Sequence, residues 1–321
     1  EDGPAPLLRF AKLIDQAGFP PGVVNIITGM GDSCGKALTS HPLVDRIAFT
    51  GGPTTAKQIV MNSANNLAAV SLELGGKSPV LVFEDADLES AANAIVSGIF
   101  AATGQSCVAG SRLLVHSSVH AELLEILVAK AKRIKIGDPQ NLETEMGPLA
   151  TKRQLVHVQD VVDRSVAAGA KLLTGGKVPA GFESGYYYEP TILDCAESTL
   201  ACVQEEIFGP VLSILRVNTY DEALNLVNSH QYGNGTAIFT NDGGAARRFQ
   251  NEVEVGMVGI NVPIPVPMAY YSFGGWKNSL FGDSHAHGTE GVHFFTRGKV
   301  VTSRWLDPSH GGINLGFPQN D

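Results

Sequence analysis

The sequence predicts an α/β fold with a doubly wound parallel sheet. Short apolar runs typical of strands alternate along the chain with segments whose apolar residues recur at helical spacing. Glycine turns, for example at Gly51 and at Gly75, lie directly after strand-like segments. With 321 residues, of which 44% are hydrophobic, the chain can bury a large core, and its length predicts about two domains.

The front part of the chain, up to about Gly75, opens this alternation. Residues 6–17 carry apolar side chains at helical spacing and predict a helix that Gly18 ends. Residues 23–28 form a continuous apolar run, which predicts a strand covered on both faces. The next predicted elements are a helix over 32–40, a strand over 46–50, a helix over 54–65 and a strand over 70–74.

Two glycine turns in this part each lie between a strand and a helix. The first contains Gly29, Gly31 and Gly35. Their spacing differs from the dinucleotide fingerprint, so they either approach a nucleotide or only let the chain turn tightly. The second contains Gly51 and Gly52, and backbone N–H groups at such a helix start can hold a pyrophosphate.

The pattern starts afresh after Gly75, and we place a domain boundary there. The chain then divides into a front domain over 1–75, a second domain over 76–275, a return segment over 276–305 and a tail over 306–321. The elements predicted beyond the boundary are a strand over 80–83, helices over 87–103, 118–133 and 151–168, a strand over 186–193 and a final strand over 299–305.

Glu73 and Cys107 lie on either side of the predicted boundary. Glu73 leaves a strand-like run and Cys107 comes after a glycine break, so the helix-length and strand-length segments between them allow the chain to fold back and bring the two together. A thiolate is a strong nucleophile toward a carbonyl carbon, and a carboxylate can act as general base. On spacing alone, a buried structural cysteine and a solvated glutamate are the commoner outcome.

Composition excludes several classes of partner. A net charge of −9 argues against nucleic acid and anionic membranes, and no apolar run approaches the roughly 20 residues needed to span a bilayer. The four cysteines are scattered, without a CxxC pair or histidines at metal-ligand spacing, which predicts a reduced, cytoplasmic protein without a metal site. The chain opens with Glu1 rather than Met, so we expect a piece that starts inside a domain.

Three motifs resemble signatures of the aldehyde dehydrogenase superfamily, and they are LELGGKSP at 72–79, GQSC at 104–107 and EEIFGPV at 205–211. The resemblance extends to about Trp305. It implies an aldehyde dehydrogenase-like fold, the remnant of a doubly wound dinucleotide-binding domain plus an α/β catalytic domain, with the active site at the crevice between them. It also implies NAD(P)-dependent oxidation of an aldehyde, in which Cys107 forms a thioester and Glu73 activates water, and a homodimer or homotetramer.

The resemblance further implies a set of cofactor-binding residues: Glu1, Gly31, Gly51, Gly52, Leu74, Glu206 and Phe208. The carboxylate of Glu206 would accept hydrogen bonds from the nicotinamide ribose, and Phe208 would lie near the nicotinamide ring. Gly52 departs from the family, which usually has Ser at this phosphate contact. The acidic Glu1 would lie near the adenosine ribose, where a carboxylate repels a 2′-phosphate, so NAD is favoured while NADP stays possible.

From about Val217 onward the chain resembles one branch of the family. Residues 232–236, 255–267 and 272–283 are similar to methylmalonate-semialdehyde dehydrogenases, which oxidise an acid semialdehyde and pass the acyl group to coenzyme A. Relatives that use coenzyme A generally lack a glutamate at the position of Glu73. The front half therefore implies hydrolysis to a carboxylic acid, and the back half implies an acid semialdehyde as the substrate and keeps acyl-coenzyme A as the alternative product.

Two functions from other classes stay open. A non-catalytic nucleotide-binding relative would keep the fold without the reaction. A Cys-dependent hydrolase would need a histidine beside Cys107, and no histidine lies within the motifs, because the cluster of His285, His287 and His293 is near the end of the chain.

Overall fold

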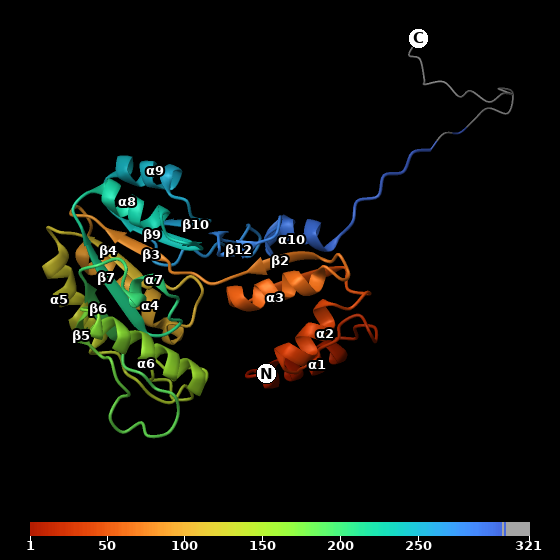
Figure 1. Ribbon diagram of the computed structural model, residues 1–321, viewed down its shortest axis with the longest axis horizontal. Helices are drawn as coiled ribbons and strands as arrows, with labels where there is room; N and C mark the ends of the chain where they lie inside the picture. Colours follow the sequence, from red (N-terminus) through yellow and green to blue (C-terminus); the bar gives the residue numbers. More distant parts are fainter. Residues whose placement is uncertain (304, 306–321) are drawn as a thin grey trace, which may run out of the picture.

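The structure, a computed structural model, describes residues 1–303 and 305, which form two α/β bodies joined by extended chain (Figure 1). In the smaller body, β1 (Arg46–Thr50) and β2 (Ala69–Glu73) pair in parallel, and the returning β12 (Leu280–Phe281) pairs antiparallel with β2. Its helical segments are α1 (Pro4–Gln16), a π-helix (Gly31–Gly35), α2 (Lys36–Thr39), α3 (Pro53–Ser63) and α10 (Gly288–Phe295).

The larger body is built on a seven-stranded sheet of order β10-β9-β3-β4-β7-β6-β5, parallel except for β5. This confirms the predicted α/β class with a parallel sheet. The strands are β3 (Pro79–Val82), β4 (Arg112–His116), β5 (Lys171–Thr174), β6 (Thr191–Cys195), β7 (Val211–Val217), β9 (Gly235–Phe239) and β10 (Met257–Ile260). A separate pair, β8 (Tyr232–Gly233) and β11 (Trp276–Lys277), is antiparallel.

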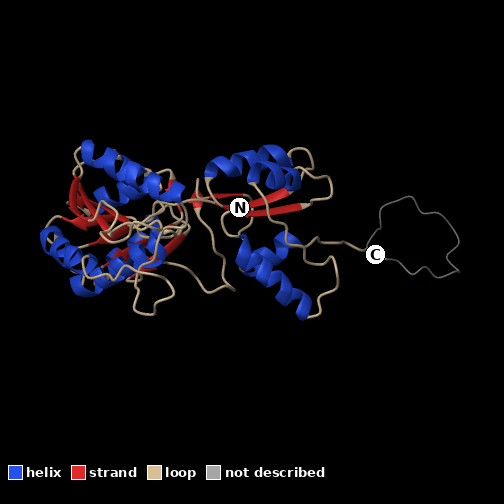
Figure 2. Ribbon diagram, turned by 90° about the horizontal axis from the view of Figure 1, so that it is seen from below, coloured by secondary structure: helices blue, strands red, loops and turns tan. Residues whose placement is uncertain are grey.

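Helices cover both faces of the larger sheet (Figure 2). They are α4 (Leu88–Phe100), a 3-10 helix (Ala101–Gly104), α5 (His120–Ala131), α6 (Lys152–Ala167), α7 (Ala201–Gln204), α8 (Tyr220–Asn228) and α9 (Gly243–Glu252). No helix in the described part of the chain combines the length and the apolar character required to cross a bilayer.

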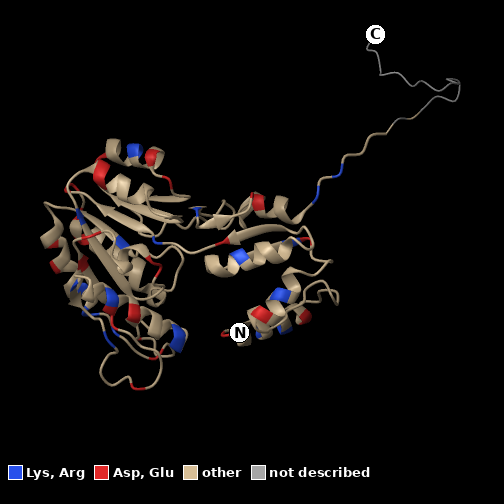
Figure 3. Ribbon diagram, in the orientation of Figure 1, with Lys and Arg blue, Asp and Glu red and all other residues tan. Residues whose placement is uncertain are grey.

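The core of the larger body lies on both sides of its sheet, because neighbouring strand residues point to opposite faces. Leu81 of β3 belongs to one buried cluster, together with Val158 of α6. Its neighbour Val82 belongs to a second cluster, together with Ile95 of α4 and Leu123 of α5. The strands therefore carry few charges, and the Lys, Arg, Asp and Glu residues gather on the helices and loops (Figure 3).

Side-chain caps fix where two helices of the larger body begin. Asp87 accepts a hydrogen bond of 2.8 Å from the Ser90 N–H at the start of α4. Thr151 accepts one of 3.1 Å from the Gln154 N–H at the start of α6. Such caps satisfy donors that the first helical turn leaves open, and they set the register of the helical side chains.

The apolar run over 23–28 is not the buried strand that its composition predicts. It is irregular chain, in which Val23 is 63% and Ile27 is 67% exposed. β1 forms one edge of the smaller sheet, and no strand among the described residues pairs with its outer side. An apolar run becomes a strand only where a neighbouring strand supplies hydrogen-bond partners, so this prediction is wrong for the chain as it stands.

Two predicted boundaries also differ from the structure. The helix predicted over 87–103 ends at Phe100, because the chain turns sharply there, with φ of 50° at Ala102 and 57° at Thr103. The strand predicted over 186–193 begins only at Thr191, and Tyr188 before it is fully buried as irregular chain.

The final strand predicted over 299–305, which the family resemblance pairs with another subunit, is not formed within a single chain over residues 299–303 and 305. Residues 299–303 and 305 have no strand partner, and Val300 is 95% exposed. This segment leads away from the smaller body (Figure 1), so within a single chain it has no neighbouring strand with which to form hydrogen bonds. Arg304 and the predicted tail over 306–321 lie outside the described residues.

Candidate active site

A cleft of about 610 Å³ lies where the two bodies meet. The smaller body contributes the chain just after β1 and β2, and the larger body contributes the loops that precede β4 and β7. The lining residues are Thr50, Gly51, Gly52, Leu74, Gly75, Gln105, Ser106, Cys107, Gln154, His157, Glu206 and Phe208. Clefts between domains are favoured places for ligands, and this one contains both a thiol and a carboxylate.

Cys107 is half-buried on the loop between the 3-10 helix and β4. Gly104 sets the path of this loop, because its φ is +69° and a Cβ there would lie 2.0 Å from the Gly209 carbonyl oxygen. Burial raises the pKa of the Cys107 thiol, the Asn234 amide opposes that rise, and the negative charges of Glu206 and Glu73 add to it. The thiol therefore needs a base before it can react.

Glu206 lies just after α7 and reaches across the cleft to the turn after β2. Its Oε1 accepts a 2.9 Å hydrogen bond from the Gly76 N–H. Gly75 has to lack a side chain, since a Cβ there would lie 2.1 Å from Glu206 Oε2. Burial raises the pKa of the Glu206 carboxyl, and the Gly76 hydrogen bond acts in the opposite direction. The carboxylate is thus held in one place at the junction of the two bodies.

Glu73 is the last residue of β2, and its side chain is only 6% exposed. Its Oε1 has no hydrogen-bond partner among the described residues, and burial raises the pKa of the carboxyl to about 7. Glu73 is not among the residues that line the cleft, but its charge acts on the Cys107 thiol. A carboxyl that titrates near neutral pH and whose charge acts on a thiol is suited to take up and release a proton.

The buried Glu73 carboxyl makes the stability of the fold depend on pH. Its pKa is 4.5 ordinarily and about 7 in the fold, so its contribution is fully present below pH 4.5 and is lost as the pH rises through 7. With allowance for screening, Glu73→Gln should raise the free energy of unfolding by about 1–2 kcal/mol at about pH 8 and change it little at about pH 4. Urea unfolding at both pH values measures this, and an equal effect at both would contradict it.

The chain that leads into α3 lines the cleft through Gly51 and Gly52. Gly52 is the N-cap residue of α3 and provides no side-chain cap, and Pro53 is the first helical residue. Gly51 is tightly placed, because a Cβ there would lie 2.4 Å from the Phe49 ring. Uncapped N–H groups at the start of an 11-residue helix suit a phosphate, so this part of the cleft fits a dinucleotide.

Two predicted cofactor residues do not line this cleft. Glu1 is exposed at the end of the chain, where its neighbour Asp2 lies 3.4 Å from Arg153 of α6. Gly31 is exposed at the start of the π-helix. Phe208, by contrast, lies at the mouth of the cleft, 40% exposed and with a φ of 52°.

Two polar residues of the cleft have no signal in the sequence, and a third, Gln105, lies in the GQSC motif without an assigned role. Gln154 and His157 lie on α6, where the His157 ring is 3.3 Å from the Glu206 carbonyl oxygen and Gln154 donates to the Ile207 carbonyl at 2.7 Å. Gln105 Oε1 accepts a 3.0 Å bond from the Ala150 N–H. Periodicity cannot reveal such residues, because a polar helix face that lines a cleft has the same pattern as one that faces solvent.

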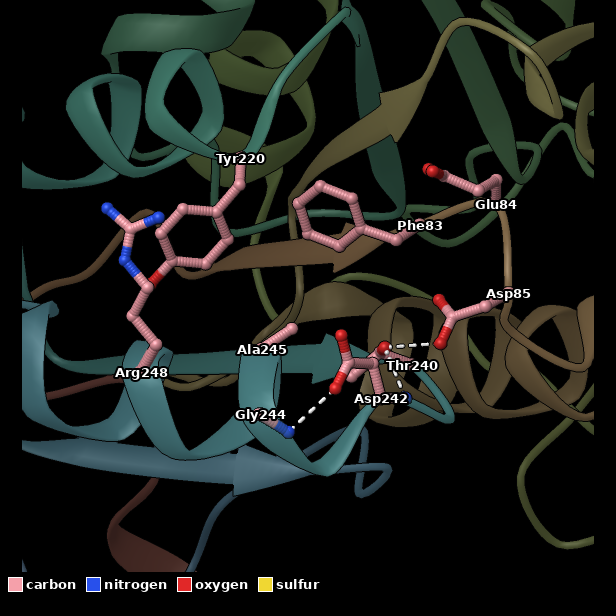
Figure 4. Close-up of a pocket in the computed structure, with 9 residues that line it drawn as sticks. All are labelled: Phe83, Glu84, Asp85, Tyr220, Thr240, Asp242, Gly244, Ala245 and Arg248. Atoms are coloured by element: carbon pink, nitrogen blue, oxygen red, sulfur yellow. Dashed lines mark hydrogen bonds between the residues drawn. The ribbon is translucent and has the colours of Figure 1, made fainter.

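A second pocket, of about 420 Å³, lies at the opposite edge of the larger sheet, beyond the ends of β3 and β9 (Figure 4). Its polar groups are already paired with one another or with their neighbours. Asp85 accepts from the Thr240 hydroxyl, and Asp242 accepts from the Gly244 N–H, both at 2.7 Å. Arg248 lies over the Tyr220 ring and also pairs with two carboxylates. The cleft around Cys107 is therefore the candidate active site.

Comparison with known proteins shows which family the chain resembles. The chain matches the model of the aldehyde dehydrogenase family over residues 1–301. It is 51% identical over 309 residues to the (Z)-2-((N-methylformamido)methylene)-5-hydroxybutyrolactone dehydrogenase of Acinetobacter baylyi, with 96% of this chain and 62% of the relative covered. It is 41% identical over 322 residues to the malonate-semialdehyde dehydrogenase of Pseudomonas aeruginosa, with 99% and 65% covered. The chain thus spans less than two thirds of these curated relatives.

Solved structures agree with the architecture. A Sinorhizobium meliloti protein in complex with NAD, provisionally described as a methylmalonate-semialdehyde dehydrogenase, superposes with a TM-score of 0.92 at 37% identity, over 95% of this chain and 62% of the other. The betaine aldehyde dehydrogenase of Staphylococcus aureus, in complex with NAD⁺, gives a TM-score of 0.86 at 36% identity, over 89% and 57%.

Proposed function

Because the chain belongs to the aldehyde dehydrogenase family, we propose that it oxidises an aldehyde with NAD as hydride acceptor and releases a carboxylic acid by way of a thioester on Cys107. One observation carries this proposal. A single cleft holds the Cys107 thiol, the Glu206 carboxylate and the chain that leads into α3, and the buried Glu73, whose charge acts on the thiol, directly precedes two of the lining residues, Leu74 and Gly75.

Cys107 acts first as the nucleophile. Glu73, whose pKa is about 7, takes the proton from the thiol, and the thiolate then forms a bond to the aldehyde carbon. Glu73 then releases this proton to solvent and is a carboxylate again before hydrolysis. The carbonyl oxygen becomes an oxyanion, for which the Cys107 backbone N–H is a donor. A bound nicotinamide would supply the hydride acceptor for this carbon, and as the hydride leaves the oxyanion re-forms the carbonyl, so that the carbon stays on Cys107 as a thioester.

The residues around the cleft have distinct tasks in holding the dinucleotide. The backbone N–H of Gly52 and the uncapped N–H groups of α3 beyond Pro53, which has none, would hold its phosphates, and the carboxylate of Glu206 would accept hydrogen bonds from ribose hydroxyls. Phe208 and Leu74 limit where the nicotinamide ring lies. Gly31 and the acidic Glu1 stay on the adenosine side in this proposal, and a carboxylate there favours NAD over NADP.

Glu73 completes the turnover. Its carboxylate removes a proton from water as the water oxygen bonds to the thioester carbon, the bond from carbon to sulfur breaks, and the thiolate of Cys107 is regenerated with the carboxylic acid. Glu73 is neutral after this step and returns its proton to solvent. A carboxyl with a pKa of about 7 can alternate between these two states under ordinary conditions.

The names of the relatives point to a substrate class. Malonate semialdehyde is an aldehyde that carries a carboxylate, and a 5-hydroxybutyrolactone is the ring-closed form of an aldehyde that carries a carboxylic acid. Both names therefore share the chemistry of an acid semialdehyde, which we propose as the substrate class.

Transfer of the acyl group to coenzyme A is the second candidate. The similarity of residues 232–236, 255–267 and 272–283 to methylmalonate-semialdehyde dehydrogenases favours it, as does the Sinorhizobium meliloti structure. In that case a thiol, rather than water, attacks the thioester on Cys107. The presence of Glu73, with its raised pKa, favours water.

The test is an absorbance assay for reduced nicotinamide with the purified full chain, NAD and malonate semialdehyde, together with product analysis with and without coenzyme A. We expect reduced nicotinamide and a free dicarboxylic acid in both reactions. An acyl-coenzyme A product would support the second candidate instead. No reduction with any acid semialdehyde would favour a non-catalytic relative.

A further inference from the structure

Asn234 lies directly beside Cys107, although the two are far apart in sequence. It sits between β8 and β9 and is 2% exposed. Its Nδ2 donates a 3.0 Å hydrogen bond to the carbonyl oxygen of Cys107. Its own carbonyl oxygen accepts a 3.1 Å bond from the Met257 N–H, which ties it to the start of β10. Through its side-chain amide on one side and its backbone carbonyl on the other, Asn234 thus joins the loop that carries Cys107 to the sheet of the larger body.

Close packing on two sides fixes the Asn234 side chain. A Cβ on Gly76 would lie 3.0 Å from Asn234 Cβ and 2.5 Å from the Cys107 carbonyl oxygen, and a Cβ on Gly275 would lie 3.1 Å from Asn234 Cα. Two glycines therefore make room for this one amide. Asn234 Oδ1 is buried without a hydrogen-bond partner among the described residues. The orientation that lets the amide nitrogen donate to Cys107 therefore leaves the amide oxygen unsatisfied, which costs free energy.

A primary amide has two N–H groups, and one is already used by the Cys107 carbonyl. The same Asn234 amide, held beside Cys107 by this bond, lowers the pKa of the thiol, against the larger rise that burial causes. A donor to a charged sulfur is stronger than a donor to a neutral one. Asn234 is therefore in a position to favour the ionised form of the cysteine.

We propose that Asn234 is a positioning residue for Cys107, which holds the carbonyl of the Cys107 loop with one N–H and stabilises the thiolate with the other. This inference rests on the proposed function in one respect, namely that Cys107 is the nucleophile. It assigns Asn234 no contact with the substrate or the cofactor. Its consequence is a thiol that ionises more readily than burial alone would allow.

The experiment measures how fast iodoacetamide alkylates Cys107 as a function of pH, with the modified peptides quantified by mass spectrometry. Two variants of similar size are compared with the wild type: Asn234→Leu removes the donor, and Asn234→Asp replaces it with a negative charge. Cys34, half-buried on the π-helix of the other body, is the internal control in every sample.

We expect the Cys107 alkylation profile to shift to higher pH in Asn234→Leu, so that its rate at neutral pH falls about tenfold, as the loss of a hydrogen bond to a charged group implies. Asn234→Asp should shift it further, because an added negative charge also disfavours the thiolate. The rate at Cys34 should not change. A purely structural role would leave the Cys107 profile where it is in any variant that folds.

A Cys107 profile that is unchanged in Asn234→Asp would overturn the inference, provided that circular dichroism and the urea midpoint show an intact fold. Should Asn234→Leu fail to fold, the nearly isosteric Asp variant still decides the question. The outcome is also separable from the proposed function. If wild-type Cys107 reacts no faster than Cys34, the nucleophile assignment fails, whereas a fast wild-type reaction with unchanged variants removes only the role of Asn234.

Discussion

Replacement of Cys107 by serine should lower the rate of aldehyde oxidation by about a thousandfold or more. The serine hydroxyl has nearly the size of the thiol but ionises far less readily, so the first bond to the aldehyde carbon does not form at a useful rate. Cofactor binding should persist, because the donors at the start of α3 and the Glu206 carboxylate are untouched. Reduced nicotinamide formed per second, together with NAD titration, measures both.

Cys34→Ser is the matched control for this variant. Cys34 is also a half-buried free thiol, but it lies on the π-helix, away from the cleft. Its replacement should leave turnover at the wild-type level. Wild-type turnover in Cys107→Ser would show that another residue carries the covalent step.

Replacement of Glu73 by glutamine should divide the reaction into two phases. The amide cannot accept a proton from water, so release of carboxylic acid should fall by a factor of about a hundred to ten thousand. Formation of the thioester needs no water, and in the part of the Cys107 population that is ionised it still proceeds. In a stopped-flow experiment we expect a burst of reduced nicotinamide in the first turnover, followed by slow steady-state formation of reduced nicotinamide that is limited by hydrolysis of the thioester.

Glu206→Gln provides the comparison, because it alters a carboxylate assigned to the cofactor rather than to water. Glu206→Gln should raise the KM for NAD. It should change the amplitude of the first-turnover burst less than it changes the affinity for NAD. A Glu73→Gln enzyme that releases acid at the wild-type rate would rule out the general-base role. Recovery of fast turnover on addition of coenzyme A would show that a thiol can replace water as acceptor.

Much of the fold can be predicted from the sequence because its elements carry their own determinants. β1, β2 and β3 coincide with apolar runs, and α3 begins directly after the glycine turn at Gly51 and Gly52. The run over 23–28 fails for a nonlocal reason, since its strand character needs a partner beside β1 that the described chain lacks. Local pattern cannot report the absence of a neighbour.

The residues of the candidate site likewise fall into those that the sequence predicts and those that it does not. Cys107, Glu206 and Gly52 lie in glycine-bounded motifs and meet in one cleft, whereas Glu1 and Gly31 were assigned by the same route and do not line it. Asn234 and His157 were not assigned at all. Asn234 contacts Cys107 across more than a hundred residues of chain, and His157 contacts Glu206 across about fifty. Contacts between residues so far apart in sequence produce no periodic pattern that could predict them.

The pairing of β12 with β2 ties the acid to a segment two hundred residues later. Leu280 is the strand partner of Glu73, and the Leu74 N–H donates to the Ser279 carbonyl at 2.9 Å. Proteolytic cleavage before residue 279 would expose this side of Glu73 to water, and the pKa of its carboxyl would fall toward the ordinary value of a glutamate. Limited digestion should therefore inactivate the protein through its acid–base residue while the thiol and its loop remain in place.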